Sequence, residues 1–318
     1  MAQPTNEQII AMLNEDLKGE HAAIIQYLRH AYAMGEGELA SEIEAIAREE
    51  MYHFDWLSDL IVELGGKPTI ARGNVDLGGN EVAEWMHRDV LLEQEAIDLY
   101  RKHIAVIDNP KIVRVLERIV SDEESHQGDF THFVDKAKAE MPGGDGIPVE
   151  QPAPDQKTVD ILNQGVRHEY TVVLQYLYHA FMTPNREVGE ELHWQAVNEM
   201  QHMGWLSEEV MGMGADADME HTEVDLSEDT VEMLKADIAA ERAVTMDYDA
   251  QLKEVSDEGI KKLLSRIRDH EIYHDQLFSE MLEEIESNEP AGTTPDAKPA
   301  GTSDSQPGIP SIGSLIEK

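Results

Sequence analysis

The feature that most constrains this chain is that its sequence occurs twice. The segment "LNEDLKGEHAAIIQYLRHAY" at 13–32 corresponds to "LNQGVRHEYTVVLQYLYHAF" at 162–181, with an offset of 149 residues. With the same offset, "EEMYHFDWL" at 49–57 corresponds to "NEMQHMGWL" at 198–206, and later segments correspond with an offset of 148. Two copies of this length predict two similar domains in a pseudo-two-fold pair, not a longer solenoid.

Each copy has the pattern of a helical bundle. Apolar residues recur at spacings of three and four through most of the chain, which predicts an all-α fold with four helices per copy. Thr5 with Gln8 is typical of a capping box, and Asn109 before Pro110 is typical of an N-cap followed by proline at the first helical position. The expected helices span 6–34, 37–64, 80–107, 110–140, 156–183, 186–212, 227–255 and 257–287.

The composition of the segments outside the expected helices predicts two linkers. The stretch "MPGGDGIPVEQPAPDQ" is rich in proline and glycine and separates the two copies, whereas "EPAGTTPDAKPAGTSDSQPG" has too few apolar residues to fold and is typical of a flexible linker. The expected organisation is a first bundle, a short linker, a second bundle, a disordered linker and a terminal peptide, at 1–142, 143–155, 156–287, 288–307 and 308–318.

Four glutamates and two histidines stand at matched positions in each copy. Each copy has a Glu on its first and third expected helices and a Glu-x-x-His on its second and fourth. Residues at i and i+3 share a helix face, so each Glu and His pair can converge on one point. The twelve residues are Glu20, Glu50, His53, Glu93, Glu123, His126, Glu169, Glu199, His202, Glu241, Glu271 and His274.

These residue types indicate a pair of metal ions in each bundle, because four glutamates and two histidines of this arrangement are the di-iron or di-manganese site of ferritin-like bundles. Four buried carboxylates carry a charge of −4, which two divalent ions would neutralise in a low-dielectric core. The chain has no cysteine, so thiolate sites are excluded. Oxygen and imidazole ligands suit iron or manganese, and the residue types do not choose between them.

The overall charge restricts the partners. Sixty-five acidic residues against 25 basic ones give a formal charge of −40, which disfavours nucleic acid and anionic membrane surfaces. Self-repulsion of this size is screened at molar salt, where the Debye length is about 3 Å, so we expect a halophilic source. We find neither a signal-peptide pattern nor a run of 18 apolar residues, and the expectation is a cytoplasmic protein.

The chain resembles bacterioferritin at the residues that carry the two clusters. "LNEDLKGEHAAIIQYLRHAY", "EEMYHFDWL", "RDVLLE" and "SDEESH" are similar to that family's four ligand-bearing helices in order, and "NEMQHMGWL", "ADIAAE" and "RDHEIYH" repeat the similarity in the second copy. The resemblance implies a ferroxidase centre with two irons in each bundle, which oxidises Fe(II) with O2 or H2O2. It also implies that Glu50, Glu123, Glu199 and Glu271 bridge the metals.

The resemblance suggests one further cofactor and a role for aromatic residues. Met51 and Met200 stand where bacterioferritin has the methionine that ligates haem across its subunit two-fold, so the resemblance implies one haem b between the two halves. Core packing is the alternative for both methionines. Tyr27, Tyr100 and their counterparts either hydrogen-bond a ligand, carry an oxidising equivalent or pack in the core.

The end of the chain differs from bacterioferritin. That family has single-bundle subunits that build a hollow cage, whereas here two bundles are fused. The terminal "SIGSLIEK" resembles the peptides that load cargo into encapsulin shells, which implies that an encapsulin shell protein is the partner and stores the iron. Apolar anchors in an extended peptide suit a preformed groove. The anchor residues would be Ile309, Ile312, Gly313, Ser314 and Leu315.

Two other functions use the same residues. A di-manganese catalase or a peroxidase needs the same ligand types, although the absence of cysteine excludes a rubredoxin-like route for electrons. A non-enzymatic iron-binding carrier would bind Fe(II) without oxidising it. Titration with Fe(II) in air separates the carrier from the enzyme, and metal analysis with a catalase assay separates the two kinds of enzyme.

Overall fold

The computed structural model describes residues 3–35, 37–140 and 155–288, and eight helices account for most of them. The expected terminal linker and peptide, and most of the connector between the copies, lie outside the described residues. The all-α prediction is confirmed. The helices are α1 (Asn6–Met34), α2 (Glu38–Glu63), α3 (Val82–Ile104), α4 (Pro110–Glu140), α5 (Gln156–Met182), α6 (Arg186–Gly212), α7 (Thr230–Gln251) and α8 (Glu258–Asn288).

Local side-chain chemistry sets the helix starts. The Thr5 hydroxyl accepts from the Gln8 amide, and the Gln8 side chain accepts from the Thr5 amide at 2.9 Å, so the expected capping box is present. Asn109 Oδ1 accepts from the Lys111 amide at 3.0 Å, which caps α4. Helix α7 begins at 230 instead of the expected 227, because the Asp229 carboxylate caps the first turn there.

Each half consists of two helical hairpins joined by a long crossover. Helix α1 pairs with α2 and α3 with α4, and the second half repeats this order. The two crossovers are anchored in the same way: Asn14 Oδ1 accepts from the Thr69 amide at 2.7 Å, and Asn163 Oδ1 accepts from the Asp218 amide at 2.8 Å. The duplication therefore extends to how each crossover lies against its bundle.

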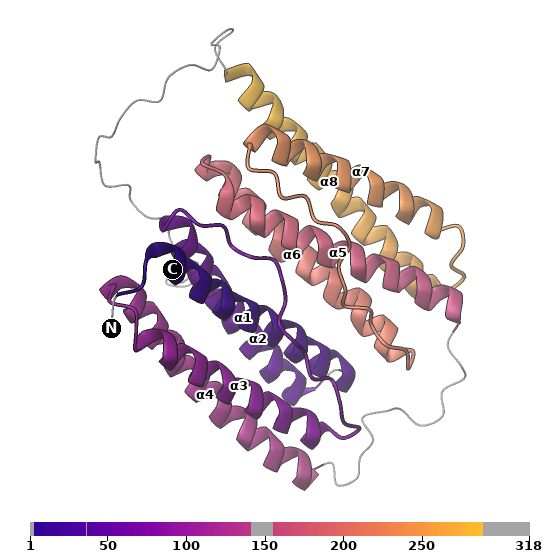
Figure 1. Cartoon of the computed structure of the whole chain (residues 1–318). Coiled ribbons are helices and arrows are strands. Elements are labelled where there is room, and N and C mark those ends of the chain that lie inside the picture. The colour runs from indigo at the N-terminus through magenta and orange to yellow at the C-terminus, as the bar shows by residue number, and fades with distance from the viewer. Residues whose placement is uncertain (1–2, 36, 141–154, 289–318) are drawn as a thin grey trace, which may run out of the picture.

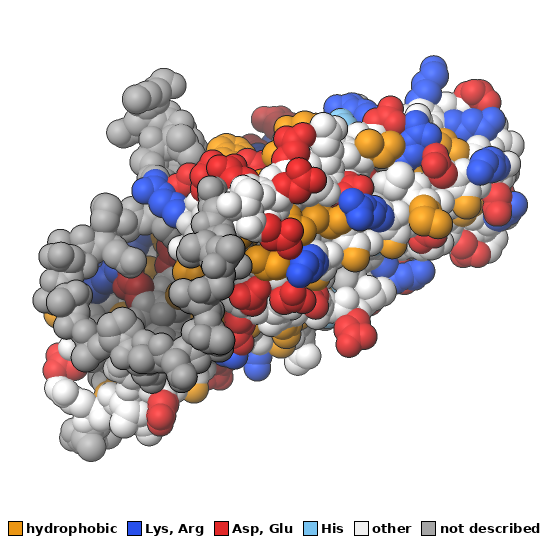
Figure 2. Space-filling model, turned by 90° about the horizontal axis from the view of Figure 1, so that it is seen from above, with side chains coloured by type: hydrophobic (Ala, Val, Ile, Leu, Met, Phe, Trp, Pro, Cys, Tyr) orange, Lys and Arg blue, Asp and Glu red, His pale blue; other side chains and the backbone are white. Residues whose placement is uncertain are grey.

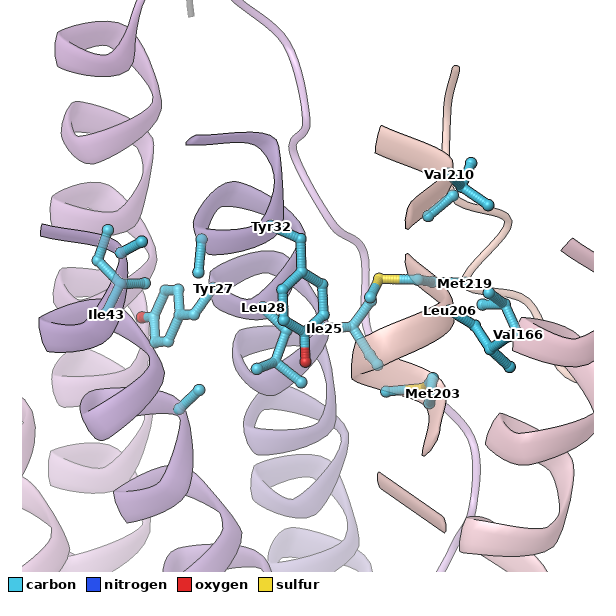
Figure 3. Close-up of a cluster of buried hydrophobic side chains, with 14 of the residues drawn as sticks. Ile25, Tyr27, Leu28, Tyr32, Ile43, Val166, Met203, Leu206, Val210 and Met219 are labelled. Carbon is cyan, nitrogen blue, oxygen red and sulfur yellow. The ribbon is translucent and has the colours of Figure 1, made fainter. Parts of the chain in front are cut away.

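The two halves share an apolar core. Helix α1 packs on α6 and α2 on α5, and Figure 3 shows Ile25, Leu28 and Tyr32 facing Met203 and Leu206 across this boundary. One hydrophobic cluster of buried residues therefore spans both halves, which is typical of a fixed domain pair and not of two tethered domains.

One contact marks the pseudo-two-fold axis. His21 Nε2 lies 2.5 Å from the Tyr170 hydroxyl, and these two residues occupy matched positions at the offset of 149. Matched positions meet only where they are close to the axis that relates the copies. Arg72 of the first crossover reaches across beside them and donates to the Met219 carbonyl at 2.8 Å and to the Glu220 carboxylate at 2.6 Å.

The described surface carries many acidic side chains. Figure 2 shows acidic groups along one face, with basic groups and separate apolar side chains between them. Among the described residues, no helix combines the length and the apolar character needed to span a membrane.

Candidate metal centre

All twelve matched glutamates and histidines lie inside the bundles. Their exposed fractions are 3% or less, which is unusual for carboxylates, because Glu is almost never fully buried without a partner. Each helix of a half contributes from its inward face, so the first and third helices supply one Glu and the second and fourth supply a Glu and a His. By contrast Glu95 on α3 and Glu124 on α4, which lie close to Glu93 and Glu123 in the sequence, are exposed.

In the first half, Glu50 and Glu123 lie between the two histidines. His53 Nδ1 is 2.8 Å from Glu50 Oε2 and 3.0 Å from Glu123 Oε1. His126 Nδ1 is 2.9 Å from Glu50 Oε1 and 3.3 Å from Glu123 Oε2. The two oxygens of each carboxylate therefore face different histidines, which is the arrangement that a bridging carboxylate requires.

The other two glutamates of this half lie at opposite ends of the cluster. Glu20 Oε2 is 3.5 Å from His53 Nδ1, and Glu93 Oε1 is 3.8 Å from the Nδ1 atom of the other histidine. Each also accepts a hydrogen bond from a buried tyrosine, Glu20 from Tyr100 and Glu93 from Tyr27 at 2.5 Å. The tyrosines thus hold the outer carboxylates, which was one of the roles considered from the sequence.

The second half reproduces this geometry. His202 Nδ1 is 2.7 Å from Glu199 Oε2 and 3.2 Å from Glu271 Oε1. His274 Nδ1 is 2.6 Å from Glu199 Oε1 and 3.3 Å from Glu271 Oε2. The outer glutamates accept from tyrosines here too, Glu169 from Tyr248 and Glu241 from Tyr176.

The donor atoms form two metal-sized groups in each half. In every group four candidate ligand atoms lie within 4.8 Å of one another. The two groups of one half share both central carboxylates and differ in the histidine and the outer glutamate, so each half offers two adjacent positions. The groups are Glu20, Glu50, His53 and Glu123; Glu50, Glu93, Glu123 and His126; Glu169, Glu199, His202 and Glu271; and Glu199, Glu241, Glu271 and His274.

Several cluster atoms make no well-directed hydrogen bond among the described residues, although some of them lie within ion-pair distance of a histidine nitrogen. A buried polar atom without a partner costs free energy, so such atoms in a repeated cluster indicate a missing ligand. A cation that accepts several oxygen and nitrogen donors would satisfy them. The orphaned atoms are Glu50 Oε1, Glu123 Oε1, Glu169 Oε2, Glu199 Oε1, Glu241 Oε2, Glu271 Oε1 and His274 Nδ1.

The outer carboxylates are poor acids in the metal-free fold. Burial, followed by the neighbouring charges of Glu123 and Glu50, raises the pKa of both Glu20 and Glu93 well above the usual range. Burial and the charge of Glu271 raise the pKa of Glu241 to about 8. Glu241 is therefore mostly protonated at neutral pH unless a cation compensates its charge, and the pKa values of Glu20 and Glu93 shift in the same direction.

The histidines behave in the opposite way. Burial lowers the pKa of His126, but hydrogen bonds to Glu123 and Glu50 outweigh it and raise the pKa to about 11. The pKa of His202 rises to about 12 because hydrogen bonds to Glu169 and other carboxylates outweigh the burial. Without a metal ion His126 and His202 thus keep their protons at neutral pH, and metal binding at Nδ1 must displace them.

Sequence reasoning missed a second set of matched buried groups. His30 Nδ1 lies 2.9 Å from Asp89 Oδ2, and His179 Nδ1 lies 3.0 Å from Asp237 Oδ1. The same comparison of the two copies would have found both pairs. In the first half Gln26 links this pair to the crossover, since it donates to Asp89 at 2.8 Å and accepts from a crossover amide. The pairs thus support the bundle beside the cluster.

The fold and the clusters define a class: a fused pair of four-helix bundles, each with a buried group of glutamates and histidines shaped for two metal ions. The family model for the ferritin-like domain matches residues 10–139 and again residues 159–288. The chain therefore belongs to the ferritin family, and its tandem organisation is confirmed.

Bacterioferritins are among the proteins to which this chain is similar. The bacterioferritin of Desulfovibrio desulfuricans is 32% identical over 125 residues, which cover 37% of this chain and 70% of that protein. The bacterioferritin of Streptomyces coelicolor is 36% identical over 125 residues, which cover 37% of this chain and 75% of that protein. A solved structure of the Desulfovibrio desulfuricans protein is 28% identical with a TM-score of 0.41, and the match covers 46% of this chain and 91% of that one.

Proposed function

We propose that this protein is a ferroxidase, in which each half binds two Fe(II) ions and oxidises them to Fe(III). The observation that carries the proposal is the sharing of two central carboxylates between two histidines, with the four candidate ligand atoms of each group within 4.8 Å of one another. The similarity to bacterioferritins supports iron as the metal. The second half supports the same role because its distances repeat those of the first.

The reaction requires each half to hold two Fe(II) ions, which are the reductants, next to each other. Two Fe(II) ions give up two electrons, which with two protons convert H2O2 to two H2O or O2 to H2O2. The four carboxylates balance the charge of two divalent ions, and the tyrosine hydroxyls fix the outer carboxylates. Iron binding would displace the proton from the Nδ1 atom of a ligating histidine such as His126.

A di-manganese catalase or peroxidase is the second candidate. Its support is the donor set itself, because carboxylate and imidazole groups suit manganese as well as iron. X-ray anomalous scattering at the iron and manganese edges of protein purified from its source would separate the two metals. A carrier without oxidase activity would bind the same ions and would not consume O2.

The experiment is an Fe(II) titration of metal-free protein with O2 consumption recorded. We expect fast oxidation of four irons per chain, followed by turnover. Glu50→Ala combined with Glu199→Ala removes a shared carboxylate from each half and should abolish the fast phase. Glu93 and Glu95 lie on the same helix and provide a matched comparison. Glu93→Gln, at the buried position, should slow oxidation, and Glu95→Gln, at the exposed position, should not. Binding without O2 consumption would contradict the proposal.

Haem remains a separate prediction. The Met51 and Met200 side chains are half-buried at matched positions, and Met51 packs on the core that joins the halves. Met51 and Met200 would hold the haem iron through their thioethers, and the haem would supply an electron-transfer group. Protein expressed with excess haem and purified without a Soret absorption band would remove this prediction.

We further propose that the chain is cargo of an encapsulin shell in the cytoplasm, with the terminal residues Ile309, Ile312, Gly313, Ser314 and Leu315 as the docking peptide. The support is the sequence pattern, since residues 289–318 lie outside the described ones. Coexpression with an encapsulin shell protein should load the full chain, and removal of 308–318 should prevent loading. A scrambled 308–318 segment is the matched control, and loading of either altered chain would contradict the proposal.

A further inference from the structure

The two clusters differ in what lies behind their histidines. In the first half the outward nitrogen of each imidazole faces a carboxylate: His53 Nε2 is 3.4 Å from Asp122 Oδ2, and His126 Nε2 is 3.0 Å from Glu49 Oε2. When Nδ1 binds a metal ion, Nε2 keeps the ring proton and can donate it to the carboxylate. Arg118 Nη2 lies 2.9 Å from the other oxygen of Asp122 and orients it.

In the second half both carboxylates are replaced by neutral groups. His270 stands at the position that matches Asp122, and its Nδ1 lies 2.8 Å from His202 Nε2. Asn198 matches Glu49, and its amide donates to Gln195 at 2.9 Å.

The arginines at the corresponding positions of the two halves also make different contacts. Arg266 matches Arg118 in sequence, but its guanidinium lies 4.2 Å from the centre of the Trp205 ring and makes a cation–π contact there. The exchange therefore changes a whole local arrangement and not a single side chain.

We propose that the two metal centres are unequal: the first binds its ions more tightly and favours the ferric state, and the second binds more weakly and favours the ferrous state. This inference rests on the proposed function insofar as both clusters hold iron. A carboxylate that accepts the outward N–H of a metal-bound histidine makes the imidazole a stronger ligand, and its loss costs about 10–100-fold in metal affinity.

Charge acts in the same direction. Six carboxylates belong to the first centre when Asp122 and Glu49 are counted, and four belong to the second. A ferrous pair carries +4 and a ferric pair +6, so the second centre is matched to the ferrous pair and the first to the ferric pair. The side chain of Glu49 is 56% exposed and Arg118 offsets part of the Asp122 charge. Both effects reduce the difference without reversing its sign.

Unequal centres would give one chain two steps in iron handling. The first centre would fill first and keep its ions through oxidation, as a resident cofactor does. The second would fill last and release its products more readily, as a site of transit does. The assignment can be tested without measuring activity, because affinity and reduction potential report on it directly.

The test is an anaerobic calorimetric titration of the full chain with Fe(II) in molar salt. We expect two phases of two ions each, with dissociation constants about 10–100-fold apart. Glu123→Ala should remove the tight phase and leave the weak one, and Glu271→Ala should do the opposite. A single phase of four equal ions would overturn the inference while leaving the proposed function intact. Failure to bind iron at all would overturn both.

Exchange variants then test the residues named. His270→Asp should strengthen the weak phase by about tenfold or more, and Asp122→Asn should weaken the tight phase by a similar factor. Glu124→Gln, next to Glu123 but exposed, should change neither phase. A redox titration monitored by optical absorption should show a more negative reduction potential for the first centre than for the second. This difference should disappear in Asp122→Asn. Unchanged affinities and potentials in both exchange variants, with melting temperatures near that of the parent chain, would overturn the roles of Asp122 and His270.

Discussion

Replacing Glu241 with glutamine should stabilise the metal-free protein and at the same time impair its metal binding. Glu241 lies on α7 with 1% of its surface exposed, and burial followed by the charge of Glu271 raises its pKa to about 8. Glutamine has the shape of the protonated acid. Its carbonyl oxygen can still accept the hydrogen bond that Tyr176 donates to Glu241 Oε1, so the change removes the ionisable group and keeps the contact.

The magnitude follows from the shift in pKa. The unfolded chain has a pKa of 4.5 for this group and the folded chain about 8, so above pH 4.5 folding must take up a proton. Each pH unit costs about 1.4 kcal/mol, which gives roughly 3 kcal/mol at pH 7 and nothing below pH 4.5. Glu241→Gln removes this cost. For a chain of this size the expected rise in melting temperature at pH 7 is about 5 °C.

Circular dichroism melting curves of the metal-free protein in molar salt test this at pH 7.5 and pH 5. The difference between variant and parent chain should be large at pH 7.5 and small at pH 5, and Glu283→Gln on the exposed face of α8 should change neither curve. Added Fe(II) under nitrogen should raise the melting temperature of the parent chain more than that of the variant. A variant that melts below the parent at pH 7.5 without metal would refute the reasoning, as would a difference independent of pH.

Three other predictions concern the boundary between the halves and the surface. A methyl group added at Gly204 would lie 2.9 Å from the Tyr32 hydroxyl, so Gly204→Ala should cost about 1–3 kcal/mol in urea unfolding. Adding Tyr32→Phe should restore most of the loss, and an equally unstable double variant would contradict this cause. Burial, then the charge of Arg72, lowers the pKa of His21 from 6.5 to about 3, so its neutral form stabilises the fold and this contribution falls below pH 6.5. His21→Gln should therefore lose about 2 kcal/mol less than the parent chain between pH 6.5 and pH 5, and equal losses in urea unfolding would refute it. Dialysis from molar salt to 50 mM salt should lower the melting temperature, and an unchanged value would contradict the halophilic interpretation.

The sequence was sufficient for the helices and for the twelve cluster residues, and the reason is physical. A Glu and a His three residues apart must share a helix face, and two copies in register show which acids are needed at fixed places. Glu93 could thus be separated from Glu95, and only Glu93 is buried. The same comparison could have found His30 and Asp89, which recur at matched positions and were overlooked.

The residues behind the histidines could not be found in this way. Asp122 and His270 stand at corresponding positions but are different residues, so a search for residues shared by the two copies excludes them. Their role becomes visible only in the structure, where each contacts a histidine on a neighbouring helix. The contact of Arg72 with the second half is similar, because a crossover has no periodicity from which a partner can be inferred. Contacts between different helices or loops are set by tertiary packing, which no single segment encodes.

The axis contact shows what fusion of the halves permits. In a dimer of identical subunits the two-fold axis brings a residue against its own copy, so the position of His21 would meet another histidine. Here the matched position is Tyr170, and a hydrogen bond forms between imidazole and hydroxyl groups. Identical subunits cannot place two different residues at such a position, whereas a chain that encodes both halves can. The same freedom allows His270 and Asn198 to replace the acids of the first half, so a duplicated pair of centres can diverge while the packing that joins them is kept.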